Sequence, residues 1–340
     1  MCRIFLWLAL CLLLGAGRLP AAVINGHGYV PVADWATANG LKVVRGGQGK
    51  QITVTNRVLR AVFEVNSQEA KINGVAVRLL FPVAADRNVP LISQLDCDKT
   101  LRPILYPPRQ PAGQHLTTIC LDPGHGGKDT GNRVGAYNEK TYTLALAQEL
   151  HDQLVKAGFK VILTRTTDEY VDLPLRPALA NRKGADLFVS LHFNATEDGK
   201  TEVQGPETYC ITPVGASSSN AQGDGASYGP TTANRFDQQS MLLAYQTQKS
   251  LVRNLGATDR GVRRARFAVL RDAAMPAILI EGGYMTHPVE GKRIFDAGYR
   301  RLMARAIVQG ILAYKSAVQP PAPAPAPVRM PGPTKPGHHP

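Results

Sequence analysis

The sequence predicts an α/β protein with a twisted, mostly parallel sheet flanked by helices, preceded by a small β-rich domain. Apolar strand-like runs alternate with helical patterns between residues 116 and 316, as expected for a sheet covered on both faces. Residues 23–106 instead alternate short β-like runs with turns. A length of 340 residues fits about two domains.

The first 22 residues have the pattern of a secretory signal peptide. Arg3 precedes an apolar run at residues 4–14, and small residues lead to Ala21 and Ala22. The run is shorter than a membrane span requires. We therefore expect secretion to the periplasm or cell envelope, with no stable membrane insertion after cleavage. An uncleaved anchor is the alternative.

The region 23–106 contains β-like runs at residues 51–55, 58–65 and 75–81. Asn-Gly pairs at Asn25 and Asn73 each favour a tight hairpin. Four prolines between Pro103 and Pro111 predict a stiff linker, which we assign to residues 107–115. We expect this region to be a separate domain that does not contact the chemistry.

The larger unit, residues 116–316, is predicted to alternate strands and helices. Residues 213–238 are rich in Gly and Ser, predicting a long surface loop that is a flank or lid of the cleft. The tail, residues 317–340, is rich in Pro and Ala and is predicted to be disordered. Expected strands are 117–121, 159–164, 185–191, 207–211, 268–271 and 277–280, and expected helices are 139–156, 176–183, 239–255 and 288–314.

Composition limits the class of protein and its partners. Hydrophobic residues make up 44% and charged residues 19%, which excludes a mainly disordered chain and a multi-span membrane protein. Lys and Arg number 39 against 26 Asp and Glu, a net charge of +13 that favours an anionic partner. Secretion and the lack of a nucleic-acid motif exclude nucleic acid and favour the cell wall.

Three cysteines follow the predicted signal, at Cys97, Cys120 and Cys210. Their odd number and spacing indicate neither a disulfide framework nor a cysteine zinc site. Cys120 and Cys210 both fall in expected strands, so a bridge between them and a pair of buried thiols both stay open, with the thiols favoured.

Four polar residues fall where expected elements meet. His125, His192 and Glu281 each follow an apolar strand, and Glu139 opens the first long helix. Ligand crevices of α/β sheets lie beyond the carboxyl ends of strands, so these groups are expected in one pocket. Two imidazoles and a carboxylate form a catalytic zinc set with one open position, and a further carboxylate serves as base. Each residue alone has an ordinary explanation, such as a first-turn acid stabilised by the helix dipole.

Several motifs are more specific than this spacing. The strings LDPGHGGKDTG, ADLFVSLHFNA and PAILIEGGYMTHP occur in this order, and the chain over about residues 117–315 resembles the zinc-dependent N-acetylmuramoyl-L-alanine amidase family of type 3. The resemblance implies hydrolysis of the amide between N-acetylmuramic acid and L-alanine in peptidoglycan, for wall remodelling or daughter-cell separation. It also implies one Zn²⁺ per chain, held by His125, Glu139 and His192, with Glu281 as the catalytic residue.

Further expectations follow for substrate and partners. We expect Gly126, Gly127 and Asn194 to contact substrate, peptidoglycan to be the partner, and the protein to be a monomer. Some family members carry a helix that plugs the zinc site, but residues 213–238 are too rich in Gly and Ser for one. The alternatives are a zinc peptidase or deacetylase acting on another wall amide, or a non-catalytic wall-binding protein.

The N-terminal region resembles the copper-amine-oxidase N-terminal-like accessory domain of secreted bacterial enzymes. The resemblance rests on INGHGYVPVADWATANG and INGVAVRLLFP. The region offers His27 as its one imidazole, so we expect no copper site. Wall anchoring, spacing or a structural cap are the expected roles.

Overall fold

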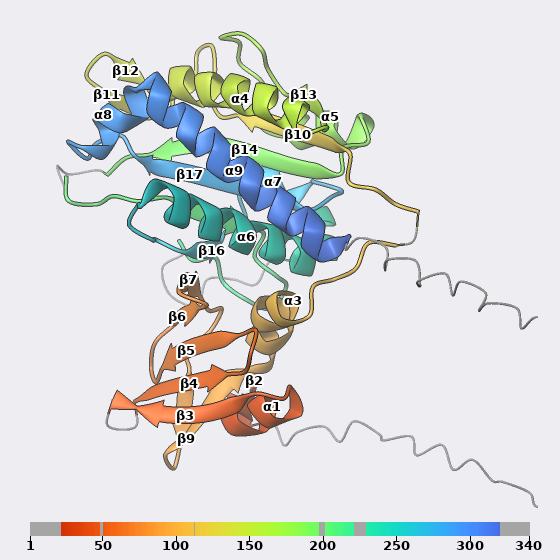
Figure 1. Ribbon diagram of the computed structural model, residues 1–340, viewed down its shortest axis with the longest axis vertical. Coiled ribbons are helices and arrows are strands. Elements are labelled where there is room, and N and C mark those ends of the chain that lie inside the picture. The colour runs from red at the N-terminus through yellow and green to blue at the C-terminus, as the bar shows by residue number, and fades with distance from the viewer. Residues whose placement is uncertain (1–21, 48–49, 112, 197–200, 221–228, 320–340) are drawn as a thin grey trace, which may run out of the picture.

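The computed structural model describes residues 22–47, 50–111, 113–196, 201–220 and 229–319. The predicted signal peptide lies outside these residues except for Ala22, and the predicted tail lies outside them beyond residue 319. In Figure 1 the N-terminal region forms the lower part of the molecule and the larger α/β unit the upper part.

The N-terminal region is built from two curled antiparallel arrangements of short strands. One sheet has the order β1-β2-β9-β8, and β3 to β7 form a meander. The hairpin turns β1–β2 and β6–β7 place Asn25 and Asn73 at positive φ, which confirms the predicted Asn-Gly turns. The strands are β1 (Ala22–Ile24), β2 (His27–Pro31), β3 (Lys42–Gly46), β4 (Gln51–Thr55), β5 (Arg60–Glu64), β6 (Glu69–Ile72), β7 (Val75–Arg78), β8 (Ala84–Asp86) and β9 (Val89–Ser93).

Short helices complete this region. Asp96 is fully buried and receives backbone hydrogen bonds from Leu80 and Phe81, which tie the helical turn after β9 to the end of β7. Pro103 lies in a helix and is buried, and this helix ends at Leu105, before the residues assigned to the linker. The helices are α1 (Val32–Ala38), α2 (Gln94–Asp96), η2 (Cys97–Leu101) and α3 (Arg102–Leu105).

The larger unit contributes six strands to the central sheet. Their order is β13-β10-β14-β17-β15-β16, with parallel pairing from β13 to β17, antiparallel pairing of β17 with β15, and parallel pairing of β15 with β16. The complete sheet, with β7 to β3 added, is therefore mixed. Its strands in this unit are β10 (Thr118–Pro123), β13 (Lys160–Leu163), β14 (Leu187–Asn194), β15 (Glu207–Cys210), β16 (Val262–Arg264) and β17 (Ala277–Tyr284).

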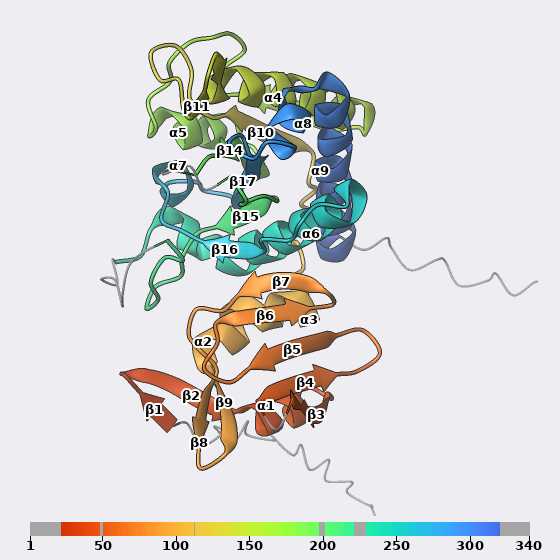
Figure 2. The same ribbon diagram turned by 90° about the vertical axis from the view of Figure 1, so that its left-hand side faces the viewer.

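Helices cover both faces of this sheet, as the alternating pattern predicts. Figure 2 shows α4, α8, α9 and α6 on one side of the strands and α5 and α7 on the other. The buried side chains of α4 recur every three or four residues, as in Leu146, Leu150 and Leu154. The helices are α4 (Glu139–Lys156), α5 (Leu175–Arg182), η3 (Thr232–Phe236), α6 (Asp237–Leu255), α7 (Ala268–Arg271), α8 (Glu290–Phe295) and α9 (Ala297–Val318), and a small hairpin is formed by β11 (Arg133–Val134) and β12 (Tyr137–Asn138).

Three expectations about these elements are wrong. Residues 268–271 form a helix and not a strand, because a run of four residues is too short to show a period. The helix expected over 288–314 is two helices, since Asp296 is extended and its carboxylate accepts the backbone N–H of Tyr299, which starts α9. The loop expected at 213–238 contains η3, and residues 221–228 of it lie outside the described residues.

The N-terminal region is not isolated from the larger unit. Strand β7 pairs in parallel with β16, with Val77 opposite Val262, so one sheet runs through both regions. Both figures place β7 directly below β16 and α6. The two units therefore pack edge to edge, because an open edge of each sheet is covered by the other.

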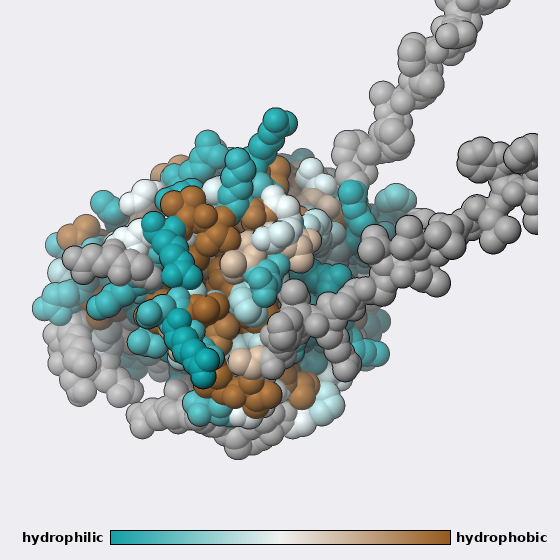
Figure 3. Space-filling view, turned by 90° about the horizontal axis from the view of Figure 1, so that it is seen from below, coloured by the Kyte–Doolittle hydropathy of each residue, from teal (hydrophilic) through white to brown (hydrophobic). Residues whose placement is uncertain are grey.

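The three described cysteines, Cys97, Cys120 and Cys210, are free and buried, so the structure contains buried thiols and no Cys120–Cys210 bridge. Figure 3 shows hydrophobic residues between hydrophilic ones on the end of the molecule formed by the N-terminal region. Val23, Val44 and Val58 are exposed there, a common feature of protein surfaces. Within the described residues, no helix has the length and apolar character needed to cross a membrane.

Candidate metal centre

The loop after β10 is held by two buried arginines. Arg165 donates to the carbonyl oxygens of Pro123 (3.0 Å) and Gly124 (2.9 Å), and Arg176 donates to those of Pro123 (2.9 Å) and His125 (2.9 Å). His125 has a φ of +61°, a left-handed conformation that is uncommon for a residue with a side chain. The guanidinium groups offset the energetic cost of this conformation by donating hydrogen bonds to the carbonyl oxygens of the turn.

Asp122 anchors the same loop from inside the sheet. It is fully buried and accepts hydrogen bonds from Thr164 (2.6 Å), Ser190 (2.7 Å) and Arg176 (2.9 Å). A buried carboxylate is tolerated when charge and hydrogen bonds compensate it, and both are present here. The turn that carries His125 is thus fixed to strands on both sides of β10.

Three side chains predicted as metal ligands meet at the end of the parallel strands. Ligand atoms of His125, Glu139 and His192 all lie within 4.8 Å of one another. Nε2 of His125 is 3.1 Å from Oε2 of Glu139, and Nδ1 of His192 is 3.0 Å from Oε1. The two imidazole rings are nearly perpendicular, with centroids 4.9 Å apart. Each nitrogen therefore faces the same carboxylate.

The surroundings keep Glu139 ionised. Burial alone would raise its pKa, but hydrogen bonds from His125 and His192 outweigh burial and hold the pKa well below its ordinary value. Backbone N–H groups of Asn132 (2.9 Å) and Phe193 (3.1 Å) also donate to its two oxygens. Glu139 is thus an oriented carboxylate, as a metal ligand must be.

Asp129 orients the imidazole of His125. Its Oδ2 lies 2.9 Å from Nδ1 of His125, on the side of the ring opposite Glu139. A carboxylate at this position selects the tautomer that leaves Nε2 free to bind a cation. Asp129 was not among the predicted site residues, although it stands four residues after His125 in the glycine-rich motif LDPGHGGKDTG.

Glu281 stands opposite His192 in the register of β17 and β14. Its Oε2 atom is buried and has no hydrogen-bond partner among the described residues. Burial, followed by the charges of Glu139 and Glu207, raises the pKa of Glu281 well above its ordinary value. Both residues lie inside strands that continue to Asn194 and Tyr284, so they do not end their strands as expected.

These groups line a cavity of about 330 Å³. Besides His125, Glu139, His192 and Glu281, its lining is apolar on the side formed by Leu173, Phe267, Ala268, Val269 and Leu279. Gly131 lies at the site with a φ of +62°, where an added Cβ would be 2.6 Å from both Oε2 of Glu139 and Cδ2 of His125.

The donor set fits a zinc ion. Two imidazole nitrogens and one carboxylate are the ligands of catalytic zinc sites, which leave one position open. The unpartnered Oε2 of Glu281 points to a missing polar neighbour in the same cavity. The residues present are therefore suited to hold the ion and a reacting water.

The residues expected to contact substrate are placed differently from this set. Asn194 donates to Glu207 (3.0 Å) and is not among the residues lining the cavity. Gly126 and Gly127 pack closely against backbone atoms of Glu169 and Tyr170. Their contact with substrate stays a prediction. The roles of Arg165 and Arg176 could not be read from the sequence, because the backbone carbonyls of the loop after β10, to which they donate, lie more than 40 residues away along the chain.

The fold and the site together define the class: an α/β protein in which His125, Glu139 and His192 could hold a metal ion beside Glu281. Residues 119–313 match the family described as N-acetylmuramoyl-L-alanine amidase (Amidase_3), and the chain belongs to this family. The N-acetylmuramoyl-L-alanine amidase AmiC of Neisseria meningitidis serogroup B is 31% identical over 271 residues, covering 69% of this chain and 64% of that protein.

Two further proteins are similar to this chain. The probable cell wall amidase LytH of Staphylococcus epidermidis is 34% identical over 216 residues, which cover 61% of this chain and 63% of LytH. A crystal structure of N-acetylmuramoyl-L-alanine amidase from Clostridium difficile 630 aligns with a TM-score of 0.49 and 34% identity, covering 59% of this chain and 97% of that one. The chain spans less than two thirds of the length of both curated relatives.

Proposed function

We propose that this protein hydrolyses the amide bond between N-acetylmuramic acid and L-alanine in peptidoglycan, using one Zn²⁺ held by His125, Glu139 and His192. The observation that carries the proposal is the convergence of these three ligands with Glu281 in one cavity of a chain that belongs to the amidase family. Wall remodelling or daughter-cell separation is the corresponding role.

The residues divide the chemistry between them. When bound, zinc would act as a Lewis acid and lower the pKa of a water molecule, so that the water becomes a nucleophile near neutral pH. Glu281 accepts a proton from the attacking water through Oε2 and returns it to the leaving nitrogen of L-alanine. Its raised pKa suits this exchange, because a carboxylate of ordinary pKa is a weaker base.

The rest of the site orients and shields the reactants. Asp129 and the backbone N–H groups on Glu139 hold the ligands in one geometry. The apolar wall at Leu173, Phe267 and Val269 offers a surface for the methyl groups of the lactyl ether and L-alanine.

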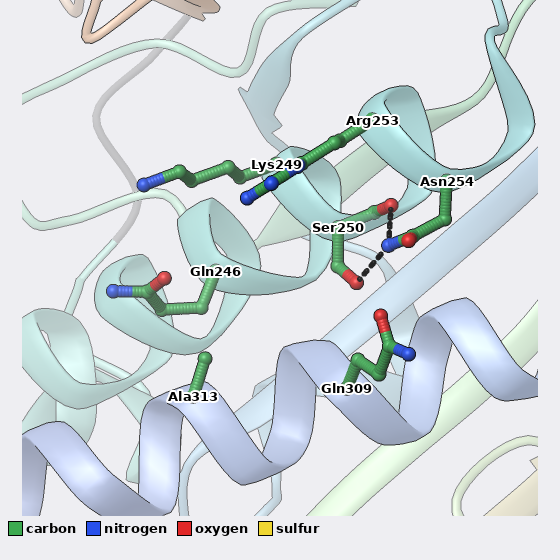
Figure 4. Close-up of a pocket in the computed structure, with 7 residues that line it drawn as sticks. All are labelled: Gln246, Lys249, Ser250, Arg253, Asn254, Gln309 and Ala313. Carbon is green, nitrogen blue, oxygen red and sulfur yellow. Dashed lines mark hydrogen bonds between the residues drawn. The ribbon is translucent and has the colours of Figure 1, made fainter.

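A basic groove supports an anionic wall as the partner. A groove of about 410 Å³ lies between α6 and α9, and none of its described lining residues is acidic. Figure 4 shows Lys249 and Arg253 extending from the same side of α6, while Gln309 rises from α9. Two cations four residues apart repel each other on a helix, and an anionic polymer would relieve that repulsion.

Secretion to the periplasm or cell envelope and a monomeric state complete the proposal. Wall-directed relatives support the location. A zinc peptidase or deacetylase would use the same metal chemistry, and a non-catalytic wall-binding protein would not need Glu281 beside the ligands. The family match favours the amidase over both.

The decisive experiment digests purified peptidoglycan with the full chain and identifies the new ends by mass spectrometry. Free stem peptides with an L-alanine amine are expected. New ends inside the stem peptide would indicate a peptidase, loss of acetate a deacetylase, and bound but uncut wall a binding protein.

A further inference from the structure

Strand β16 is one of the elements through which the larger unit contacts the N-terminal region. Besides the β7–β16 pairing, the backbone N–H of Ala76 in β7 donates to Oδ2 of Asp259 at 2.7 Å. Gly261 has a φ of +89°, and an added Cβ there would meet the carbonyl oxygen of Ala76 at 2.9 Å. The segment before β16 and strand β7 approach each other so closely that glycine is required at position 261.

Arg264, the last residue of β16, crosses this contact. Its side chain is 1% exposed. Nη2 donates to the carbonyl oxygen of Lys99 (2.6 Å) and to Oγ1 of Thr100 (3.4 Å), both in the N-terminal region, and Nη1 donates to the carbonyl of Ile211 after β15 (3.4 Å). A buried guanidinium is costly unless such acceptors surround it. The N-terminal region supplies two of these three acceptors.

Arg263, the residue before Arg264 in β16, contacts the part of the sheet that carries Glu281. Arg263 forms an ion pair of 2.8 Å with Glu207. Glu207 in turn stands opposite Glu281 in the antiparallel register of β15 and β17, so the two carboxylates share one face of the sheet. Adjacent arginines of β16 thus join the N-terminal region on one side and the neighbourhood of Glu281 on the other.

The chain then leaves β16 and forms the apolar wall of the metal cavity. Phe267, Ala268 and Val269 line that cavity and begin three residues after Arg264. The backbone of Arg264 also forms two hydrogen bonds with Ser219. Its N–H donates to Oγ of Ser219 (3.0 Å), and its carbonyl oxygen accepts from the backbone N–H of Ser219 (2.7 Å). The position of the wall therefore depends on where β16 is held.

We propose that the N-terminal region positions the substrate-binding wall of the cavity, with Arg264 as the positioning residue that transmits its docking through β16. The region is then a structural part of the active enzyme in addition to any role in wall attachment. The kinetic side of this inference rests on the proposed amidase function, whereas its structural side does not.

The test uses the full chain with Arg264→Met, which keeps an unbranched side chain but removes the donors. We expect KM for a soluble muropeptide to rise about tenfold, as for the loss of hydrogen bonds to a charged group, with little change in kcat and zinc content. Hydrogen exchange of residues 265–270 should become faster. Arg264→Lys should restore part of both properties, because an ammonium group still donates to a carbonyl.

Tyr245→Phe is the matched control. Its hydroxyl also bridges the two regions, donating to the carbonyl of Ile72 at 3.2 Å, but it comes from α6 and not from β16. It should leave KM and exchange at 265–270 unchanged. If it reproduces the effects of Arg264→Met, or if Arg264→Met has none, the proposal is overturned.

A milder pair covers the case in which Arg264→Met does not fold. Thr100→Val removes an acceptor from the N-terminal side, and Thr100→Ser keeps it. Faster exchange at 265–270 in the valine variant alone supports the proposal, and equal exchange in the two overturns it. Exchange is read without substrate, so a wild-type protein that releases no stem peptide refutes the amidase function while leaving this measurement interpretable.

Discussion

His192 lies directly opposite Glu281 in the parallel pairing of β14 and β17. His192 is one of the three candidate metal ligands, and Oε2 of Glu281 has no hydrogen-bond partner among the described residues. The register of two neighbouring strands thereby brings the proposed ligand His192 and the proposed base Glu281 into the same cavity. The division of roles between them can be tested by substitution.

Glu281→Gln should retain zinc and lose turnover by about 10²–10⁴-fold, because the amide keeps the shape of the side chain but cannot accept a proton. His125→Ala should instead lose zinc, since it removes a ligand. Elemental analysis and muropeptide turnover of both variants distinguish these effects. Zinc loss in Glu281→Gln with zinc retained in His125→Ala would reverse the assignment.

Removal of zinc should abolish activity and also loosen the site. With the ion removed by a strong chelator, wall digestion should cease, and added Zn²⁺ should restore it. The melting temperature should rise when zinc is added back, because a ligand that binds the folded state stabilises it. Full activity in protein shown by elemental analysis to be free of metal would contradict the proposed cofactor.

Gly131→Ala should weaken zinc binding by about 10–100-fold, the range seen when groups supporting metal ligands are disturbed. The new Cβ would lie 2.6 Å from Glu139 and His125 atoms. Gly135→Ala is the control, because its φ of +58° imposes similar backbone strain but nothing lies within 4 Å. Equal zinc affinity in the two variants, measured by competition with a chelating dye, would show that backbone strain alone matters.

Replacing Lys249 and Arg253 by glutamine should weaken binding to purified sacculi and flatten its dependence on salt, because two cations leave the groove between α6 and α9. The double variant of Arg182 and Lys183 to glutamine removes the same charge from the end of α5 on the other face. Co-sedimentation at several salt concentrations compares them. If both double variants weakened binding to sacculi equally, the net charge of the protein and not the groove would determine that binding.

The stability of the N-terminal region should depend on pH through Asp96. Burial raises the pKa of this carboxyl, although hydrogen bonds from Leu80, Ser93, Thr100 and Phe81 partly oppose it. The folded protein then binds the proton more tightly than the unfolded chain does. This contribution to stability is present below the unfolded pKa of about 3.9 and is lost as pH rises through the folded value.

Asp96→Asn lacks this titration. The wild-type free energy of unfolding should therefore exceed that of the variant most at acid pH, with the difference shrinking as pH rises. Urea unfolding at several pH values measures it, and Asp98→Asn, at an exposed neighbour, serves as control. A difference that grows with pH would contradict the raised pKa.

Local patterns in the sequence were sufficient for many elements. The 3.6-residue period predicts α4 with the observed ends, Glu139 and Lys156, and residues 51–55 form β4 as expected. Polar residues after apolar runs and at the start of a helix also indicated that His125, His192, Glu281 and Glu139 would meet, since the carboxyl ends of strands in one sheet lie together. These features depend on neighbours along the chain.

Other features were decided only by the tertiary structure. Val77 and Val262 are far apart in the sequence, and period two shows which face of a strand is apolar but not which strand lies beside it. For the same reason the sequence could not place Arg264 against Lys99. Hydrogen bonds to distant groups leave no local period. Chain chemistry therefore determined the candidate ligands, and long-range packing determined how they are supported.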